Sequence, residues 1–218
     1  MSDANDVRAS SKTDAVIHKQ ASPACPPNLA DYDAVRAGFS WDAARARLDG
    51  LPDGGLNIAY EALDRHARGP RAGRTALRWL GLDGSRRALT YAELLSASCR
   101  FAHALATLGV QPGERVFVLT GRVVELYVAV LGAFRAGCTV CPLFSAFGPE
   151  PIATRMELGD ARVLVTTSAL YRRKVAGIRE RLPGLRHVIL TDGELDDCLA
   201  WNDVVGGAPD DYTLVATR

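Results

Sequence analysis

Short apolar runs alternate along the chain with longer stretches in which apolar residues recur at helical spacing. The runs of strand length lie at 75–82, 86–89, 115–120, 138–140, 162–166 and 186–190. Helical spacing or helix-type composition fills most of the intervals, at 90–108, 123–136, about 149–158 and about 169–181. Strands that alternate with helices predict an α/β fold, with a mostly parallel sheet covered by helices on both faces.

Local signals place several boundaries of these elements. Asp83-Gly84 between two strand-like runs indicates a hairpin. Thr90 and Glu93 have the spacing of a capping box, which predicts a helix start at Tyr91. Gly109 and Gly137 stand where a left-handed glycine closes a helix. The run that begins at Cys138 has almost no polar alternation, which predicts a central strand buried on both faces.

The amino-terminal quarter has a different character. Residues 1–27 are rich in small and charged residues and in proline, which predicts a disordered tail. Residues 32–48 have a helical pattern in which Ser40 is a suitable cap for Trp41. Asn57 is a suitable cap for a short helix at 58–67. Residues 191–218 read as loop with one short helix near Trp201.

Composition and charge exclude several classes of protein. The 218 residues are 48% hydrophobic and 23% charged, and the net charge is +1, which disfavours a dedicated nucleic-acid or anionic-membrane binder. The longest apolar stretch, 123–136, is interrupted by charges and is too short to span a bilayer. The amino terminus lacks the apolar block of a signal peptide, so we expect a cytoplasmic protein.

The five cysteines do not have the spacing of a disulfide framework. Cys138 and Cys141 form a C-x-x-C, but residues three apart in a strand point to opposite faces and cannot share a metal. We therefore expect structural thiols and no metal site.

No active site can be assigned from the residues alone. Neither G-x-G-x-x-G nor G-x-x-x-x-G-K-[ST] occurs, and the four histidines are scattered. Thr120-Gly121-Arg122 follows a strand and could either face an anion with helix amides or form an ordinary turn. The basic cluster of Arg172, Arg173 and Lys174, followed by Arg179 and Arg181, could either clamp a phosphate or form a solvated helix face.

Five motifs in the same order resemble the adenylate-forming (AMP-binding) superfamily, in particular its acetyl-CoA synthetase (acetate–CoA ligase) branch. They are Gly55-Leu56-Asn57-Ile58-Ala59-Tyr60-Glu61-Ala62-Leu63-Asp64-Arg65-His66, Leu89-Thr90-Tyr91-Ala92-Glu93-Leu94, Leu108-Gly109-Val110-Gln111-Pro112-Gly113-Glu114-Arg115-Val116, Phe134-Arg135-Ala136-Gly137-Cys138-Thr139-Val140-Cys141-Pro142-Leu143 and Pro142-Leu143-Phe144-Ser145-Ala146-Phe147. The resemblance covers about residues 28 to 190.

The resemblance implies a ligase that uses ATP, Mg and coenzyme A. In such an enzyme, acetate or another short acid reacts with ATP to give an acyl-adenylate and pyrophosphate, and the thiol of coenzyme A then displaces AMP. The family's Thr-Ser-Gly-Thr-Thr-Gly-x-Pro-Lys-Gly loop and its catalytic lysine have no counterpart here. The expectation is therefore an inactive amino-terminal portion of such a ligase, without catalytic residues of its own.

The resemblance also implies a division of the chain and a set of ligand contacts. After the tail, residues 28–70 resemble the amino-terminal helical segment of acetyl-CoA synthetases, and residues 71–218 resemble the first part of the adenylation domain. Coenzyme A contacts are implied at Ser145, Ala146 and Phe147 and at Arg172 and Arg173. The alternative is a truncated, non-catalytic relative that acts as a binding or interaction protein.

Overall fold

The structure, a computed structural model, describes residues 28–217, and the expected disordered tail at 1–27 lies outside the described residues. The chain divides into two compact units, residues 1–47 and residues 48–218. In the first unit, residues 28–47 form two short helices, α1 (Tyr32–Ala37) and α2 (Trp41–Arg45), and have no buried side chain. Ser40 caps α2 as predicted, because its Oγ accepts the Ala43 N–H at 3.1 Å.

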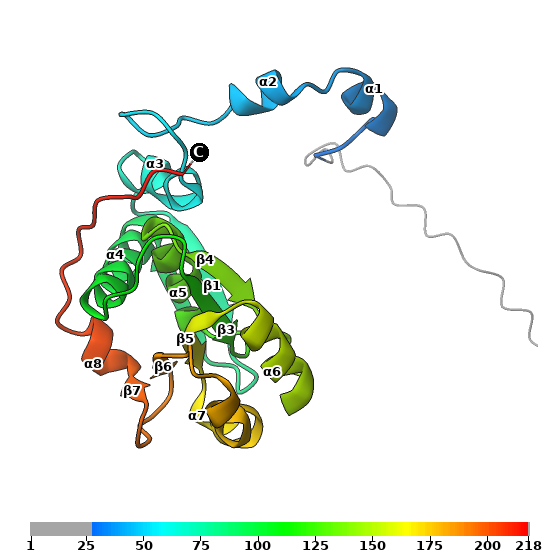
Figure 1. Cartoon of the computed structure of the whole chain (residues 1–218). Helices are drawn as coiled ribbons and strands as arrows, with labels where there is room; N and C mark the ends of the chain where they lie inside the picture. The colour runs from blue at the N-terminus through cyan, green and yellow to red at the C-terminus, as the bar shows by residue number, and fades with distance from the viewer. Residues whose placement is uncertain (1–27, 218) are drawn as a thin grey trace, which may run out of the picture. The chain divides into compact units, whose positions relative to one another are not determined.

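A parallel sheet is the centre of the second unit (Figure 1). Its strand order is β4-β3-β5-β6-β7, and every neighbouring pair is parallel. The strands are β3 (Arg115–Leu119), β4 (Thr139–Pro142), β5 (Ala161–Thr166), β6 (His187–Leu190) and β7 (Leu199–Ala200). The helices that connect them are α5 (Val124–Arg135), α6 (Pro149–Leu158) and α7 (Ser168–Leu170) with the π turn η2 (Tyr171–Val175) and the 3-10 segment η3 (Ala176–Arg181). The helix α8 (Trp201–Val205) follows β7.

A smaller set of elements precedes the sheet. These are the π turn η1 (Tyr60–Asp64), α3 (Arg65–Ala67), the antiparallel hairpin β1 (Thr75–Leu80) and β2 (Arg86–Thr90), and α4 (Tyr91–Thr107). The predicted capping box starts α4: the Glu93 amide donates to Thr90 Oγ1 at 3.2 Å, and the Thr90 amide donates to Glu93 Oε2 at 2.7 Å.

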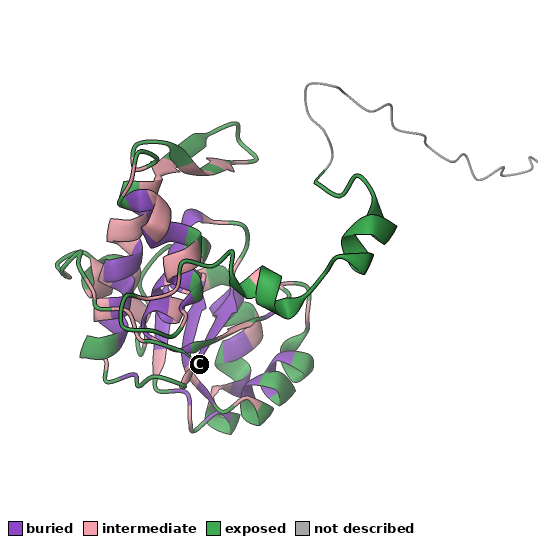
Figure 2. Cartoon of the chain, turned by 90° about the horizontal axis from the view of Figure 1, so that it is seen from above, coloured by how far each residue is buried: buried purple, intermediate pink, exposed green. Residues whose placement is uncertain are grey.

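Alternation along the strands divides the core into two clusters. On β3, Val116 and Val118 face the cluster that includes residues of α4 and α5, whereas Phe117 and Leu119 face the cluster formed by α6, η2 and η3. Figure 2 shows the buried strands between the helices, whose outer surfaces are exposed. The predicted α/β fold with helices on both faces is therefore confirmed.

The strand that begins near Cys138 is not central. β4 lies at one edge of the sheet, and its four residues are exposed or half-buried, while β5 occupies the central position and β3 lies between the two. Pro142 fits this place, because proline cannot donate a ladder hydrogen bond and is tolerated on edge strands. The order of strands in a sheet depends on contacts between segments that are distant in sequence. The apolar composition of residues 138–140 was therefore not enough to predict the position of this strand.

Candidate functional site

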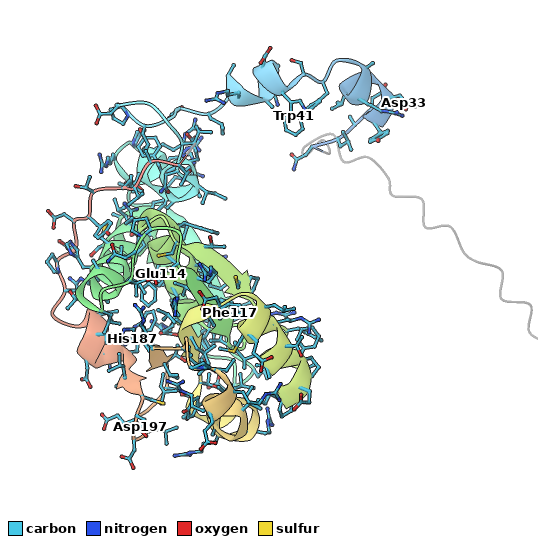
Figure 3. The ribbon with its side chains drawn as sticks, in the orientation of Figure 1. Asp33, Trp41, Glu114, Phe117, His187 and Asp197 are labelled. Carbon is cyan, nitrogen blue, oxygen red and sulfur yellow. The ribbon has the colours of Figure 1, made fainter. Side chains whose placement is uncertain are left out.

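The predicted contact residues Ser145, Ala146 and Phe147 lie in the loop that joins β4 to α6, at the carboxyl end of the sheet. Glu114, which precedes β3, and Asp197, which follows β6, mark the two opposite ends of the sheet in Figure 3. Backbone hydrogen bonds order the loop: the Leu143 amide donates to the Val118 carbonyl at 2.8 Å, and the Phe147 amide donates to the Phe144 carbonyl at 3.0 Å. In open α/β sheets, ligands bind at this end.

Aromatic contacts fix one side of the loop. The ring of Phe147 packs against the second core cluster, and the guanidinium carbon of Arg155 lies 4.4 Å from its centroid. Phe144 meets Phe147 edge-on at 5.6 Å. Ser145 is half-buried and Ala146 is exposed, so their short side chains leave the backbone between the two rings accessible.

The other two predicted residues, Arg172 and Arg173, lie on η2 with exposed side chains. Within residues 28–217, neither guanidinium forms an ion pair or hydrogen bond. The remaining basic residues of this segment have internal partners. Arg179 donates to the carbonyls of Leu182 and Leu185, and Arg181 pairs with Glu150 and Glu157 of α6. Only Arg172 and Arg173 therefore fit the predicted pair of free guanidinium groups.

Lys174 connects the loop to the basic segment. Its Nζ donates to the Ser145 carbonyl at 2.5 Å and to the Phe147 carbonyl at 2.6 Å. The two stretches singled out in the sequence are thus neighbours in space. Sequence reasoning counted Lys174 only as part of a basic cluster, although one signal was available: it is the single lysine between residues 28 and 217, against many arginines.

A groove of about 840 Å³ opens beside the loop. It is lined by the tip of the β1–β2 hairpin, by Thr120, Gly121 and Arg122 after β3, and by Leu143, Phe144 and Ser145. Trp79 Nε1 donates to the Arg122 carbonyl at 2.5 Å, which ties the hairpin to this turn. The turn lies at the start of α5, and its proposed use for an anion stays a prediction.

The cysteines have the surroundings of structural thiols. Cys138 belongs to one core cluster and Cys141 packs against the other, so the two side chains lie on opposite faces of the sheet as predicted. Burial raises the pKa of the Cys138 thiol to about 11, with a further contribution from Glu114, and burial also raises the pKa of Cys141. Both thiols are therefore protonated near neutral pH, which disfavours a nucleophilic role.

The described histidines have structural contacts. His66 meets the Tyr91 ring edge-on at 5.3 Å, and His187 Nε2 lies 3.0 Å from the Leu108 carbonyl at the end of α4. His103 contacts the Asp211 carbonyl and the ring of Tyr212. These contacts give the three rings packing roles.

Residues 28–217 contain no cluster of three or more His, Cys, Asp or Glu side chains arranged to hold a metal ion. No helix in this part of the chain is long and apolar enough to cross a membrane.

Comparison with known proteins identifies the family. The family model described as "AMP-binding enzyme" matches residues 63–211. The chain belongs to the AMP-binding enzyme family. It is similar to an acetyl-coenzyme A synthetase of Bacillus subtilis, with 35% identity over 170 residues that cover 78% of this chain and 29% of that protein. The corresponding synthetase of Deinococcus radiodurans is 33% identical over 207 residues, which cover 86% of this chain and 31% of that protein.

Solved structures agree with the sequence comparison. The crystal structure of an acyl-CoA synthetase from Brucella canis superposes with a TM-score of 0.76 and 31% identity over 86% of this chain and 34% of that one. A benzoate CoA ligase from Burkholderia xenovorans superposes with a TM-score of 0.62 and 28% identity, over 75% of this chain and 31% of that one. The chain thus spans less than a third of the length of the two synthetases from Bacillus and Deinococcus.

Proposed function

We propose that the chain is the amino-terminal portion of an acetyl-CoA-synthetase-like ligase. The observation that carries this proposal is the alignment with acetyl-coenzyme A synthetases over as much as 86% of the chain. The ligase would join ATP with acetate or another short acid to form an acyl-adenylate and pyrophosphate, and would then transfer the acyl group to coenzyme A. Magnesium would accompany ATP in the whole enzyme.

The proposal includes a division of the chain. Residues 28–70 would be the amino-terminal helical segment, and residues 71–218 would be the first part of the adenylation domain. The whole enzyme would act on small molecules in the cytoplasm, without nucleic acid or membrane as a partner. The near-neutral net charge supports that last part.

The 218 residues alone would not form an adenylate. Pyrophosphate release requires a phosphate-binding loop and a cation against the developing charge, and the sequence contains no glycine-rich phosphate loop. The test is acetate-dependent exchange of labelled pyrophosphate into ATP by the purified chain. We expect no exchange above a boiled sample, and exchange that depends on acetate would contradict the proposal.

Coenzyme A would contact the surface formed by the 144–147 loop and η2. Arg172 and Arg173 support this because both guanidinium groups are exposed and unpaired within the described residues, and adjacent guanidinium groups suit a phosphate. Ser145 and Ala146 support it because small side chains allow a ligand to approach the backbone. Phe147 would supply packing from the core side.

This contact can be measured by calorimetric titration of the chain with coenzyme A and with 3′-dephospho-coenzyme A. We expect Arg172→Met/Arg173→Met to weaken binding of coenzyme A at least about tenfold, because charge-assisted hydrogen bonds to phosphate are lost. Arg186→Met is the matched control, since Arg186 is an exposed arginine next to the opposite end of β6. An equal effect of the control, or no effect of the double substitution, would contradict the assignment.

The alternative is a non-catalytic relative that keeps the scaffold and a coenzyme A contact. Arg172 and Arg173 favour this alternative, because both residues of the proposed phosphate contact are present within the 218 residues. Sequencing of the reading frame past codon 218 separates the two. A glycine-rich loop within a short distance favours the ligase, and a stop codon favours the binding protein.

A further inference from the structure

The side chain of Lys174 spans the gap between η2 and the 144–147 loop. Its ammonium donates to the carbonyls of Ser145 and Phe147, the two residues that flank Ala146. An ammonium carries three N–H donors, so two of the three are used to hold loop backbone. Hydrogen bonds from a charged donor are stronger than those between neutral groups.

The base of this side chain is held firmly. Tyr171 and Val175, the first and last residues of η2, are buried in the core cluster against which Phe147 also packs. Lys174 itself is half-buried, and no carboxylate in residues 28–217 pairs with it. The two carbonyls are therefore its hydrogen-bond partners in the described chain.

The choice of lysine here is specific. The chain has 26 lysines and arginines, of which three are lysines, and Lys12 and Lys19 precede the described residues. A compact ammonium carries three rotatable N–H donors on one atom, so it reaches two converging carbonyls without the fixed planar geometry of a guanidinium. The single lysine of residues 28–217 thus stands where two carbonyls converge on one donor atom.

We propose that Lys174 is a positioning residue that fixes the backbone of residues 145–147 against η2. Through this contact, the 144–147 loop and the pair Arg172 and Arg173 become one rigid surface. Lys174 does not itself contact the ligand, which is contacted by these neighbouring residues. The functional part of the inference rests on the proposed coenzyme A binding. The structural part, loop ordering by Lys174, stands independently.

Hydrogen exchange tests loop ordering without any ligand. The Phe147 amide, which donates to Phe144, is the reporter in peptides that cover 143–148. We expect Lys174→Met to accelerate its exchange at least about tenfold, because two charge-assisted hydrogen bonds to the loop are lost. Arg173→Met removes the same charge from the adjacent, unpaired position and should leave the exchange unchanged. Equal exchange in Lys174→Met and the wild-type chain would overturn the proposal.

Binding measurements test the functional part. We expect Lys174→Met to weaken coenzyme A and 3′-dephospho-coenzyme A by the same factor, since the loop and not the phosphate contact is altered. Arg172→Met/Arg173→Met should instead abolish the preference for coenzyme A. Unchanged binding in a Lys174→Met chain whose loop exchanges faster would overturn the functional part. If the wild-type chain binds neither compound, the proposed function fails while hydrogen exchange still decides the role of Lys174.

One measurement needs no variant. In the wild-type chain, the Lys174 amine should react with an acetylating ester at least about tenfold more slowly than the amine of N-acetyl-lysine amide, because its hydrogen bonds must first break. Peptide mass spectrometry identifies the modified residue. Equal reaction rates would overturn the proposed contacts.

Discussion

At the scale of single residues, a buried ion pair ties the 57–67 segment to the core. Asp64 and Arg135 have fully buried side chains, and Arg135 donates to the two carboxylate oxygens at 3.2 and 2.5 Å. Ser98 accepts a third bond, from Arg135 Nε at 3.3 Å. Asn57 reinforces the same junction by donating to the Phe134 carbonyl at 2.9 Å. Two of the family motifs therefore meet through side chains that periodicity alone does not connect.

Removing one partner of this pair should be costly. We expect Asp64→Asn or Arg135→Met to lower the free energy of unfolding by about 3–5 kcal/mol. The first leaves the buried Arg135 guanidinium without a carboxylate, and the second leaves the buried Asp64 carboxylate with only the exposed Arg68 at 3.5 Å. Urea unfolding followed by circular dichroism measures the change. Arg87→Met, which breaks the exposed pair with Glu125, is the control and should cost less than about 1 kcal/mol.

The double variant Asp64→Leu/Arg135→Met separates pairing from burial. Replacing both charges by apolar groups should recover most of the loss, because neither ion then remains unpaired. A double variant as unstable as the sum of the single variants would show that the two residues act independently.

Glu61 gives the second unit a dependence on pH. Burial alone would raise the pKa of its carboxyl, but the amides of Gly50 and Asp49 and the guanidinium of Arg65 lower the pKa below its ordinary value of 4.5. A lowered pKa in the folded state means that the carboxylate stabilises the fold above about pH 4.5. That contribution is lost as the pH falls through the folded-state pKa.

We therefore expect Glu61→Gln to reduce the free energy of unfolding by about 1–2 kcal/mol at pH 7 and by progressively less below pH 4.5. Denaturant titrations at both ends of this range measure the difference. Glu180→Gln alters an exposed glutamate of η3 and should change little at either pH. A Glu61→Gln difference that stayed constant with pH would contradict the assignment.

At the scale of elements, two glycines end helices in the same conformation but in different surroundings. Gly109 after α4 and Gly137 after α5 have φ of +74° and +71°. A Cβ on Gly109 would meet nothing within 4 Å, whereas a Cβ on Gly137 would lie 2.7 Å from Val215 Cγ1. The carboxyl-terminal segment that carries Val215 runs back from α8 toward α3, where Thr217 pairs with Leu56 (Figure 1).

This pair separates backbone strain from packing. We expect Gly109→Ala to cost about 1–2 kcal/mol, the penalty of a left-handed non-glycine residue. Gly137→Ala should cost about 1–3 kcal/mol more, because Val215 must move. Chemical denaturation of both variants provides the comparison. Val215→Ala in the Gly137→Ala background should recover part of the extra loss, and equal costs at the two glycines would contradict this reading.

Local rules predicted the elements that depend on a few neighbouring residues. The capping box at Thr90, the hairpin at Asp83-Gly84 and the helix at Pro149–Leu158 all have the expected positions. The edge position of β4 was missed because it depends on which strands pair with β3, and β7 was missed because its two residues are too few to show a strand pattern. The expected helix at about 169–181 consists of an α, a π and a 3-10 turn in succession. Its apolar residues recur at steps of three and four, and this spacing alone did not distinguish these turns from a continuous α-helix.

The candidate site was predictable only in part. The resemblance named Ser145 and Arg172, and the structure places their segments side by side. It gave Lys174 no role of its own, because a contact from a side chain to backbone carbonyls 27 and 29 residues away follows no fixed spacing in sequence. The one sequence signal was that Lys174 is the single lysine between residues 28 and 217. The ion pairs of Arg181 with Glu150 and Glu157 of α6 were likewise not predictable from sequence. Because of these pairs, Arg181 is not available to bind a ligand.

At the scale of the whole second unit, apolar surface gathers around the groove. Leu80 and Leu82 at the hairpin tip and Phe144 beyond β4 are 65%, 111% and 63% exposed, and all three line it. Contiguous apolar surface of this kind marks a contact site. The relatives from Bacillus and Deinococcus are about three times as long as this chain.

We expect the purified chain to bind a hydrophobic dye or to self-associate through this groove, because water is released when its leucines and phenylalanine are covered. Leu82→Ser/Phe144→Ser should lower dye fluorescence and shift the sedimentation profile toward monomer. Leu158→Ser is the matched control, because Leu158 is 84% exposed on α6 and does not line the groove. A monomeric wild-type chain without dye fluorescence would refute the prediction. An equal loss of fluorescence in the control would assign the effect to scattered surface leucines instead.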